Sequence, residues 1–295
     1  MVDSDLLEIV VTRLDVGPRA VSAAAALLSA AERERASRFS FERDRRRFMV
    51  GRALLRRLLG ARLDVRAESV DLMFGARGKP ALAPPLAGSG LRFNVSHCED
   101  VAVYALARQR EIGIDIEALR EIPDADAIAE HMFSRYENDA YRALEPCERP
   151  VGFFNCWTRK EAYVKALGDG LHHPLDSFDV TLGPGEPARI LRVEDTAGSD
   201  CHWTLHSFAH GGGLLPFQFD GGEPPAASGG AAAGDGRAPD LAAIVGTSLV
   251  GAVVVETVAR QAAATAPPER LVVRPLPADC EDHECPQCSL SLRMS

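Results

Sequence analysis

Two carboxylates placed two residues apart in an apolar segment are the first side chains of this sequence that could do chemistry. Asp115 and Glu117 alternate with Ile114 and Ile116 in Gly-Ile-Asp-Ile-Glu. Because strand side chains alternate between faces, this pattern predicts a strand with both acids on one face. A third carboxylate, Glu161, lies in a later helical segment and can converge on the pair. Oxygen ligands of this kind suit a magnesium ion that also binds substrate phosphates, so they indicate phosphoryl-group transfer.

The helical segment 157–165, Trp-Thr-Arg-Lys-Glu-Ala-Tyr-Val-Lys, adds a cation to this set. Lys165 follows Glu161 by one helical turn, so the two side chains face the same side. Lys160 falls on another side and is a weaker candidate. The plain alternative is a helix ion pair worth roughly 0.2–0.5 kcal/mol. For the two acids of the strand, the plain alternative is a strand end with solvated side chains.

Length and charge narrow the class of protein. The chain has 295 residues and a formal net charge of −9, so it is long enough for one large domain or two smaller ones. Its acidity argues against binding nucleic acid. A local exception lies between Arg33 and Arg66, where twelve arginines stand against four acidic residues. That stretch suits a small polyanionic ligand or an acidic partner, although a solvated helix face is the ordinary explanation of a charge run.

Export and membrane signals are absent from the sequence. The first residues lack the basic start and apolar core of a signal peptide. The longest apolar run, 241–255, is short for a membrane span and contains Gly, Thr and Ser. Seven cysteines without an export signal indicate reduced thiols. We therefore expect a cytoplasmic protein without a membrane partner.

The elements that must position these side chains follow from periodicity. An amphipathic helix is expected over 48–59 with Gly60 as its stop, and a second over 153–167 with Gly168 as its cap. The polar turn 108–111 is expected to join two paired strands. The remaining expectation is a mainly helical span, 122–143. The strands are predicted at 6–14, 70–74, 91–95, 101–107, 112–116, 178–182 and 203–208.

These elements predict an α+β fold of two related lobes with a site at their junction. The N-terminal lobe is placed at 1–105 and the C-terminal lobe, with the metal site, at 106–220. After Asp220 the sequence becomes rich in Gly, Ala, Pro and Ser, which is typical of segments that cannot pack a core. Residues 221–295 are therefore assigned to a linker and a C-terminal extension.

Six short motifs, in order, carry a family resemblance. The match extends over roughly residues 5 to 210, and no single motif is specific. Together they make the chain similar to a 4′-phosphopantetheinyl transferase of the Sfp type. The motifs are Gly-Lys-Pro at 78–80, Phe-Asn-Val-Ser-His at 93–97, Gly-Ile-Asp-Ile-Glu at 113–117, the segment 157–165, Gly-Asp-Gly-Leu at 168–171 and Pro-Leu-Asp-Ser-Phe at 174–178.

The resemblance implies a fold, a reaction and a metal. Members have two pseudo-symmetric lobes with the active site between them. They move 4′-phosphopantetheine from coenzyme A to a serine of an apo acyl or peptidyl carrier protein, need Mg²⁺, and release adenosine 3′,5′-bisphosphate. Matched by position, the resemblance implies that Asp115, Glu117 and Glu161 bind the magnesium. It further implies that Glu161 is the general base, and that Lys165 stabilises the pyrophosphate or protonates the departing phosphate.

The coenzyme site is implied in the same way. Ser96, His97 and Arg47 match positions that contact the 3′-phosphate, and Lys79 matches a lysine that contacts the nucleotide. Arg33 and Arg35 fall in a region with basic residues near the nucleotide, where Glu32 stands at a position that is often lysine. Without the resemblance, Ser96-His97 would be read as a satisfied strand end and Lys79 as a residue of a surface turn.

The end of the chain departs from the family pattern. No convincing strand follows residue 210, and 249–255 could supply the last strand of the second lobe, with 211–248 as an insertion. His202, His206 and His210 are spaced for a helical metal site, but their surroundings indicate a strand and hence no metal. A cluster of Cys and His residues in the tail could bind zinc, but this site is disfavoured because the cluster contains only one Cys-x-x-Cys pair with common spacing. That cluster consists of Cys280, His283, Cys285 and Cys288.

The expected protein is a monomeric carrier-protein transferase. The alternative is a coenzyme A or nucleotide-binding regulatory module without catalysis, which would not require the base Glu161. A third reading, a zinc-dependent interaction protein, rests only on the tail. The sequence does not name the carrier protein, the pathway or the tolerance for acylated coenzyme A.

Overall fold

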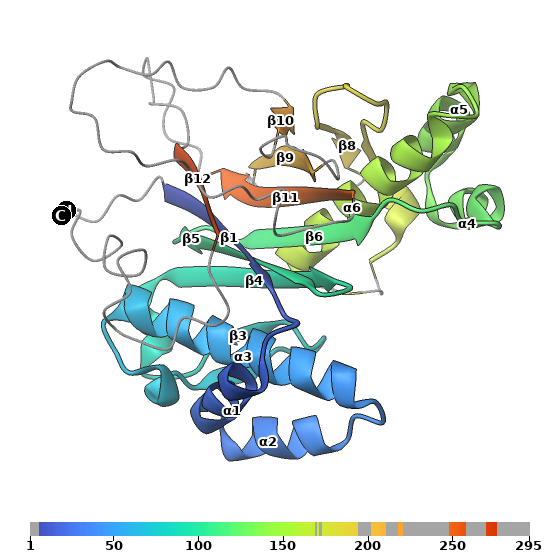
Figure 1. Ribbon diagram of the computed structural model, residues 1–295. Helices are drawn as coiled ribbons and strands as arrows, with labels where there is room; N and C mark the ends of the chain where they lie inside the picture. The colour runs from blue at the N-terminus through green and yellow to red at the C-terminus, as the bar shows by residue number, and fades with distance from the viewer. Residues whose placement is uncertain are drawn as a thin grey trace, which may run out of the picture.

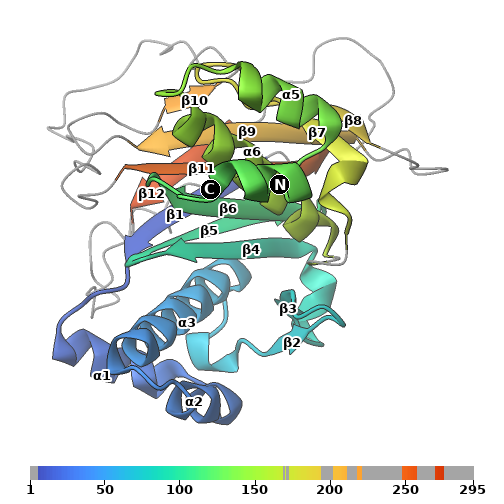
Figure 2. The ribbon, with the colours of Figure 1, turned by 90° about the vertical axis from the view of Figure 1, so that its right-hand side faces the viewer.

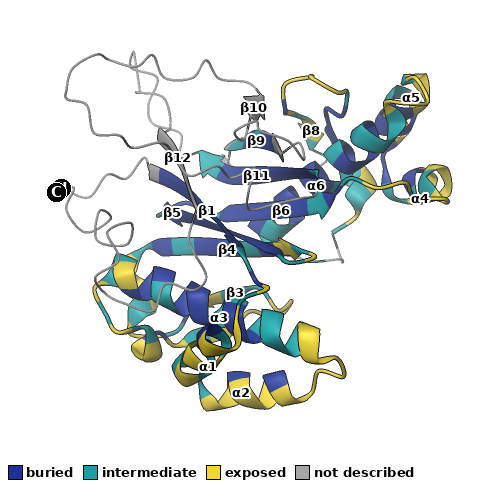
Figure 3. Ribbon diagram, in the orientation of Figure 1, coloured by how far each residue is buried: buried dark blue, intermediate teal, exposed yellow. Residues whose placement is uncertain are grey.

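Two four-stranded sheets organise the molecule (Figure 1). The structure is a computed structural model, and it describes residues 6–168, 170, 173–193, 202–210, 218–220, 248–257 and 270–275. Helices cover the outer side of each sheet, and buried residues run along the strands and the helix sides that face them (Figure 3). The mixed arrangement confirms the predicted α+β class.

The first sheet has the strand order β12-β1-β5-β4. β1 (Leu6–Arg13), β5 (Val101–Arg108) and β4 (Leu91–Cys98) are antiparallel, and β12 (Arg270–Pro275) runs parallel to β1. Its outer helices are α1 (Pro18–Leu27), α2 (Ala30–Ser37) and α3 (Glu42–Leu63). The hairpin of β2 (Leu72–Phe74) and β3 (Pro80–Leu82) and two 3₁₀ turns, Ala67–Ser69 and Leu86–Ser89, complete this half.

The prediction that α3 stops at Gly60 is wrong. The helix runs on to Leu63 and ends at Asp64, whose left-handed backbone (φ 55°) forms the cap. Gly60 lies inside the helix because the chain folds back against it. A Cβ at this position would lie 2.7 Å from the carbonyl oxygen of Val65, so the glycine permits a close approach rather than a stop.

The second sheet has the strand order β10-β9-β11-β6. Its strands are β6 (Ile112–Ala118), β9 (His202–His210), β10 (Gln218–Asp220) and β11 (Leu249–Thr257). Its helices are α4 (Ala125–Met132), α5 (Arg135–Ala143) and α6 (Arg149–Leu167), of which α6 lies in front of β6 and β11 in Figure 2. β7 (Phe178–Val180), β8 (Ile190–Val193) and the 3₁₀ turn Leu175–Ser177 stand beside it.

The span predicted as mainly helical, 122–143, is divided in two. Phe133 ends α4, and Ser134 begins α5 with a capping box to Glu137. A side chain that accepts the first orphan N–H groups favours such a new helix start. Farther along, α6 ends at Gly168, whose left-handed backbone (φ 83°) is the cap predicted from the sequence.

Segments near the end of the described chain belong to both sheets. Residues 249–255, which the sequence offers as a late strand, lie in β11 (Leu249–Thr257), which stands between β6 and β9 and pairs antiparallel with each. The last described strand, β12, joins β1 in the other sheet. The boundaries placed at 105 and 220 remain predictions.

The strands 101–107 and 112–116 are not a hairpin, so that prediction is wrong. β5 pairs with β1 and β4, whereas β6 pairs with β11 in the other sheet. Ile114 and Ile116 enter a shared apolar cluster with residues of β1 and β5 such as Ile9. The two sheets therefore meet across the isoleucine face of β6, because burying that face removes apolar surface from water.

Candidate active site

α6 lies directly on β6 at Gly113. A Cβ there would be 2.0 Å from the carbonyl oxygen of Ala162, so only glycine allows this approach. With the isoleucines of β6 facing the other sheet, the acids of β6 face α6, as the alternation predicts. The close approach brings Glu161 and Lys165 of α6 to Asp115.

Asp115, Ser96 and Lys165 form a hydrogen-bonded cluster. The Lys165 Nζ lies 2.6 Å from Asp115 Oδ1 and 3.1 Å from Ser96 Oγ. Ser96 donates to Asp115 Oδ1 at 2.9 Å. Asp115 is only 6% exposed, and its other oxygen, Oδ2, has no hydrogen-bond partner among the described residues. One carboxylate oxygen is thus held in place while the other is buried without a hydrogen-bond partner among the described residues.

Three carboxylates interact electrostatically here. Burial raises the pKa of Asp115; the charge of Lys165 opposes this shift, and that of Glu117 adds to it. Burial also raises the pKa of Glu161, and the negative charges of Asp115 and Glu117 raise it further, against Lys165. Like charges near one another favour the protonated forms. Lys165 is the cation that offsets the charge of both Asp115 and Glu161.

Glu117 stands at the outer side of this group. Its Oε2 accepts from Arg120 at 3.0 Å, and the Cys98 thiol at the end of β4 lies 3.8 Å from the same oxygen. The two acids of β6 therefore share a face but differ in setting. Asp115 is enclosed, whereas Glu117 is half-buried and reaches toward solvent-exposed Arg120.

The donor set can be compared with what a divalent cation needs. In the described part of the chain, no group of three or more His, Cys, Asp or Glu side chains is placed so that it could hold a metal ion, and Asp115, Glu117 and Glu161 are no exception as their side chains stand. The buried, unpartnered Oδ2 of Asp115 and the mutual repulsion of three acids nevertheless fit a hard cation. Mg²⁺ retains waters and needs only one or two protein carboxylates, so an incomplete set of oxygen ligands suits it.

The residues expected at the coenzyme phosphates are dispersed. His97 lies within β4, which continues past the predicted end at 95, and its side chain is exposed. Arg47 makes a double hydrogen bond to Asp15 at 2.6 and 2.8 Å. Arg35 stacks over the ring of Phe48 at 5.3 Å.

Arg33 donates to the carbonyl oxygen of Leu28. Arg35, together with Arg38 and Phe39, also lines a surface hollow of about 650 Å³. Arg33, Arg35 and Arg47 thus belong to the helical layer of the first sheet. They are not in contact with the carboxylate cluster.

Lys79 reaches between the two halves. Its Nζ lies 3.0 Å from Glu111 Oε2 and donates to the carbonyl oxygen of Ala166 at 2.8 Å. A cation at the C-terminal end of α6 is favourable for the helix dipole. A cavity of about 430 Å³ lies beside this contact and is lined by residues of both halves, including Arg92 and Gly168.

Comparison with known protein families shows the family of the chain. Residues 111–216 match the model of the 4′-phosphopantetheinyl transferase superfamily, and residues 17–109 match that of the 4′-phosphopantetheinyl transferase N-terminal region. The 4′-phosphopantetheinyl transferase HetI of Nostoc sp. is 43% identical over 166 residues, which cover 56% of this chain and 70% of that protein. The chain belongs to the 4′-phosphopantetheinyl transferase superfamily.

Other members of the superfamily are similar over a comparable span. A 4′-phosphopantetheinyl transferase of Bacillus subtilis is 33% identical over 157 residues, or 53% of this chain and 67% of its own. The human L-aminoadipate-semialdehyde dehydrogenase-phosphopantetheinyl transferase is 31% identical over 161 residues, or 52% of each chain. The protein is therefore a transferase, as the sequence predicts.

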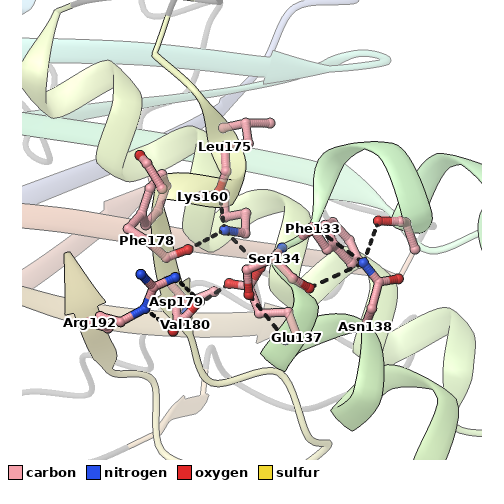
Figure 4. A network of polar contacts seen from close by, with 12 residues as sticks. Phe133, Ser134, Glu137, Asn138, Lys160, Leu175, Phe178, Asp179, Val180 and Arg192 are labelled. Carbon is pink, nitrogen blue, oxygen red and sulfur yellow. Dashed lines mark hydrogen bonds and ion pairs between the residues drawn. The ribbon is translucent and has the colours of Figure 1, made fainter. Parts of the chain in front are cut away.

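The lysine next to Glu161 has a different place in this transferase. Lys160 is fully buried, lies 2.8 Å from Glu137 Oε2 and donates to the carbonyl oxygens of Leu175 and Phe178 (Figure 4). Glu137 in turn accepts from the backbone of Val180 at 2.8 Å. The network ties α5, α6 and β7 together, which confirms that Lys160 points away from the side of Lys165.

The neighbouring arginine is buried as well. Arg159 donates to Ser207 Oγ at 2.9 Å and to the carbonyl oxygen of Thr181 at 2.6 Å. Buried cations of this kind require such partners, because an unpaired one would be costly. Consecutive residues of α6 thus attach the helix to its own sheet on one side and carry the acid Glu161 on the other.

Two residues that the sequence reasoning missed lie at the junction of the transferase. Asn94 of β4 accepts from the backbone of Ile114 at 3.0 Å. Glu111 bridges Lys79 and, at 2.9 Å, Arg92. In the sequence, Asn94 could have been noticed as a polar side chain inside an apolar strand. Glu111 could have been noticed as an acid directly before an apolar strand.

The sequence offers two other candidate metal sites, a series of histidines and a Cys/His cluster in the tail. His202, His206 and His210 lie on strand β9, as their surroundings predict. The tail cluster from Cys280 to Cys288 lies outside the described residues. Within the described ranges, no helix is long and apolar enough to cross a membrane.

Proposed function

We propose that this transferase moves 4′-phosphopantetheine from coenzyme A to a serine of an apo acyl or peptidyl carrier protein, and releases adenosine 3′,5′-bisphosphate. As a member of its superfamily it is an enzyme that modifies carrier proteins. The buried carboxylate of Asp115, with one oxygen on Lys165 and the other unpartnered, is the observation that carries the proposal for this site.

Asp115, Glu117 and Glu161 would hold a magnesium ion in this proposal. Bound there, the ion supplies the positive charge that lets the coenzyme pyrophosphate approach three acids. The orphaned Oδ2 of Asp115 supports this placement, and so does the shared rise of the Asp115 and Glu161 pKa values. Lys165 provides the remaining positive charge on the same face.

Glu161 acts as the general base. A raised pKa brings its carboxylate closer to the working pH, where proton transfer is most effective. Glu161 takes the proton of the carrier serine while the serine oxygen bonds to the phosphorus that bears the pantetheine arm. The bond from that phosphorus to the oxygen bridging to adenosine 3′,5′-bisphosphate breaks, and the electron pair stays on that oxygen. The ammonium of Lys165 stabilises this charge or donates a proton to it.

The nucleotide end of coenzyme A would be held by basic and polar side chains of the first half. His97, Arg35 and Arg33 are exposed. Ser96 precedes His97 in β4 and donates to Asp115. Arg47 and Lys79 are paired with Asp15 and Glu111, and the coenzyme phosphates would compete with those acids. Arginine suits this task because its guanidinium grips phosphate with two parallel hydrogen bonds.

The test is intact-protein mass spectrometry of a panel of apo carrier proteins. Each carrier is incubated with coenzyme A, Mg²⁺ and the enzyme, in parallel with Glu161→Ala and with Glu145→Ala, an exposed acid outside the site. A gain of one phosphopantetheine group that survives Glu145→Ala but is lost with Glu161→Ala or a chelator supports the proposal. Transfer that is unchanged in Glu161→Ala would refute the role of Glu161. A protein that binds coenzyme A but modifies no carrier would favour a regulatory module.

We also infer a cytoplasmic monomer. The acidic chain and its reduced cysteines suit that compartment. Sedimentation equilibrium at several concentrations measures the oligomeric state, and a mass near twice 31.7 kDa would contradict the inference.

A further inference from the structure

The two sheets of the transferase face each other along two edge strands that share no backbone ladder. β4 stands at the end of the order β12-β1-β5-β4, and β6 at the end of β10-β9-β11-β6. An edge strand presents N–H groups that need partners. On β6 these are the N–H groups of Ile114 and Ile116, which donate to side chains of β4: Asn94 Oδ1 at 3.0 Å and Ser96 Oγ at 3.4 Å.

This pairing fixes the position of β6 relative to β4 through side chains, in addition to the backbone ladder that β6 forms with β11. The acceptors are two residues apart on β4, and the donors are two residues apart on β6 and follow the same direction. Asp115 lies between the two pinned N–H groups. Asn94 is only 4% exposed, so the N–H of Ile114 would lose its partner without it. A buried N–H left unsatisfied costs about 1–3 kcal/mol.

The register decides where the Asp115 carboxylate points. Because side chains alternate along a strand, a slip of one residue turns every side chain of β6 to the opposite face. Asp115 would then enter the apolar layer between the sheets, where Ile114 and Ile116 now lie. Ser96 holds both the backbone of Ile116 and the Asp115 carboxylate. The Asn94 side chain bonds to the backbone of Ile114 and not to the Asp115 carboxylate, so its effect on the site is indirect.

We propose that Asn94 is a positioning residue of the metal site, which acts by holding the backbone of Ile114 so that the Asp115 carboxylate faces α6. The inference rests on the proposed function for the metal role of Asp115, and it adds a residue that does not touch the metal or the coenzyme. Side chains that orient a metal ligand typically change metal affinity 10–100-fold when removed.

The test measures the affinity of the protein for Mn²⁺ alone, by electron paramagnetic resonance of the free ion. Asn94→Leu keeps the size of the side chain and removes the acceptor. The matched control is Asn138→Leu, since Asn138 is also a buried asparagine but donates to backbone carbonyls at the junction of α4 and α5. We expect the Kd for Mn²⁺ to rise about 10–100-fold in Asn94→Leu and to stay at the wild-type value in Asn138→Leu. Hydrogen exchange at the Ile114 amide should accelerate in Asn94→Leu alone.

Several outcomes separate the explanations. An unchanged Kd in folded Asn94→Leu, or an equal rise in Asn138→Leu, would overturn the positioning role and leave the proposed transfer reaction standing. A wild-type protein that does not bind Mn²⁺ would remove the metal role and this inference together. If Asn94→Leu does not fold, Asn94→Ala is measured instead, because it leaves room for a water to accept from Ile114. A rise in Kd is still expected, because a water satisfies the N–H group of Ile114 without tying it to β4, and a wild-type value would refute the proposal.

Discussion

Gly113 of β6 lies against the carbonyl of Ala162 on α6, so closely that a methyl group at Gly113 would stand 2.0 Å from that oxygen. The contact sets the height of the helix above the strand. It explains how Lys165, one turn farther along α6 than Glu161, comes to lie 2.6 Å from Asp115. The distance between strand and helix therefore controls the geometry of the candidate site.

The first prediction is that Gly113→Ala damages both stability and catalysis. The added methyl group meets backbone atoms, which cannot move aside as a flexible side chain can, and overpacking of this kind costs about 1–3 kcal/mol or more. Chemical denaturation and carrier modification measure the two effects. Gly88→Ala, where no atom lies within 4 Å of the added Cβ, is the control. Equal stability of the two variants would contradict the close contact.

The second prediction is that Glu161→Gln stabilises the metal-free protein near pH 7.5 while abolishing transfer. The pKa of Glu161 is raised in the folded state above its ordinary value of 4.5, chiefly by burial and then by Asp115. Between the ordinary pKa of the unfolded state and the raised pKa of the folded state, the folded protein binds more protons than the unfolded one. The stability of the wild type therefore falls as pH rises through this window. Glutamine does not ionise, so the variant does not lose stability in this way as pH rises.

Melting temperatures at pH 4 and pH 7.5 check this sign. The difference between Glu161→Gln and wild type should be small at pH 4 and positive at pH 7.5. Saturating Mg²⁺ should reduce the difference in melting temperature at pH 7.5, because the ion offsets the repulsion between Glu161 and the other acids only in the wild type. A lower melting temperature for the variant at pH 7.5 would show that the carboxylate is stabilising and not strained.

The third prediction concerns the pH profile of kcat/KM. Because the pKa of Glu161 is raised, its base form is lost at a higher pH than for an ordinary glutamate. At limiting Mg²⁺ the acid limb of the profile should therefore lie above the ordinary glutamate pKa of 4.5, and saturating Mg²⁺ should move it to lower pH, because a nearby cation favours the charged carboxylate. Measurements between pH 4.5 and 8 on a carrier whose own fold is stable in that range define the limb. A flat profile down to pH 4.5 at limiting Mg²⁺ would contradict the role of Glu161 as a base with a raised pKa.

The fourth prediction is that Lys160→Met destabilises the fold strongly. The substitution leaves Glu137 buried without its cation (Figure 4), and breaking a buried pair from one side costs about 3–5 kcal/mol. The comparison is Arg38→Met, which breaks the exposed pair with Glu34 and should cost at most about 1 kcal/mol. Urea denaturation of both variants supplies the two values, and similar losses would deny the network its structural role.

The fifth prediction is that a chain ending at Gly221 does not fold into an active enzyme. The truncation removes β11, which pairs with both β6 and β9 and contributes buried residues such as Val253 and Val254 to two apolar clusters. β6 would lose its only described strand partner, and Asp115 on β6 would no longer be held in place. Far-ultraviolet circular dichroism and the carrier assay report the result. A folded, active product would show that β11 is dispensable.

Local sequence patterns predicted several elements because their causes are local. Alternation of Ile114, Asp115, Ile116 and Glu117 indicates a two-faced strand, and the structure places the isoleucines between the sheets. Gly60 shows where such reasoning fails. A glycine near the end of an amphipathic segment resembles a stop, yet here it admits the carbonyl of Val65 within a continuing helix.

The sequence by itself determined which side chains could do chemistry, their strand or helix setting, and the family to which they belong. Periodicity and motifs hold this information because neighbouring residues share one backbone conformation. Only the tertiary structure decided that β5 and β6 enter different sheets, that β11 comes from far along the chain, and that Asn94 holds the strand of Asp115. Strand partners and buried hydrogen bonds depend on contacts between distant segments, and burial of apolar surface selects among them in three dimensions.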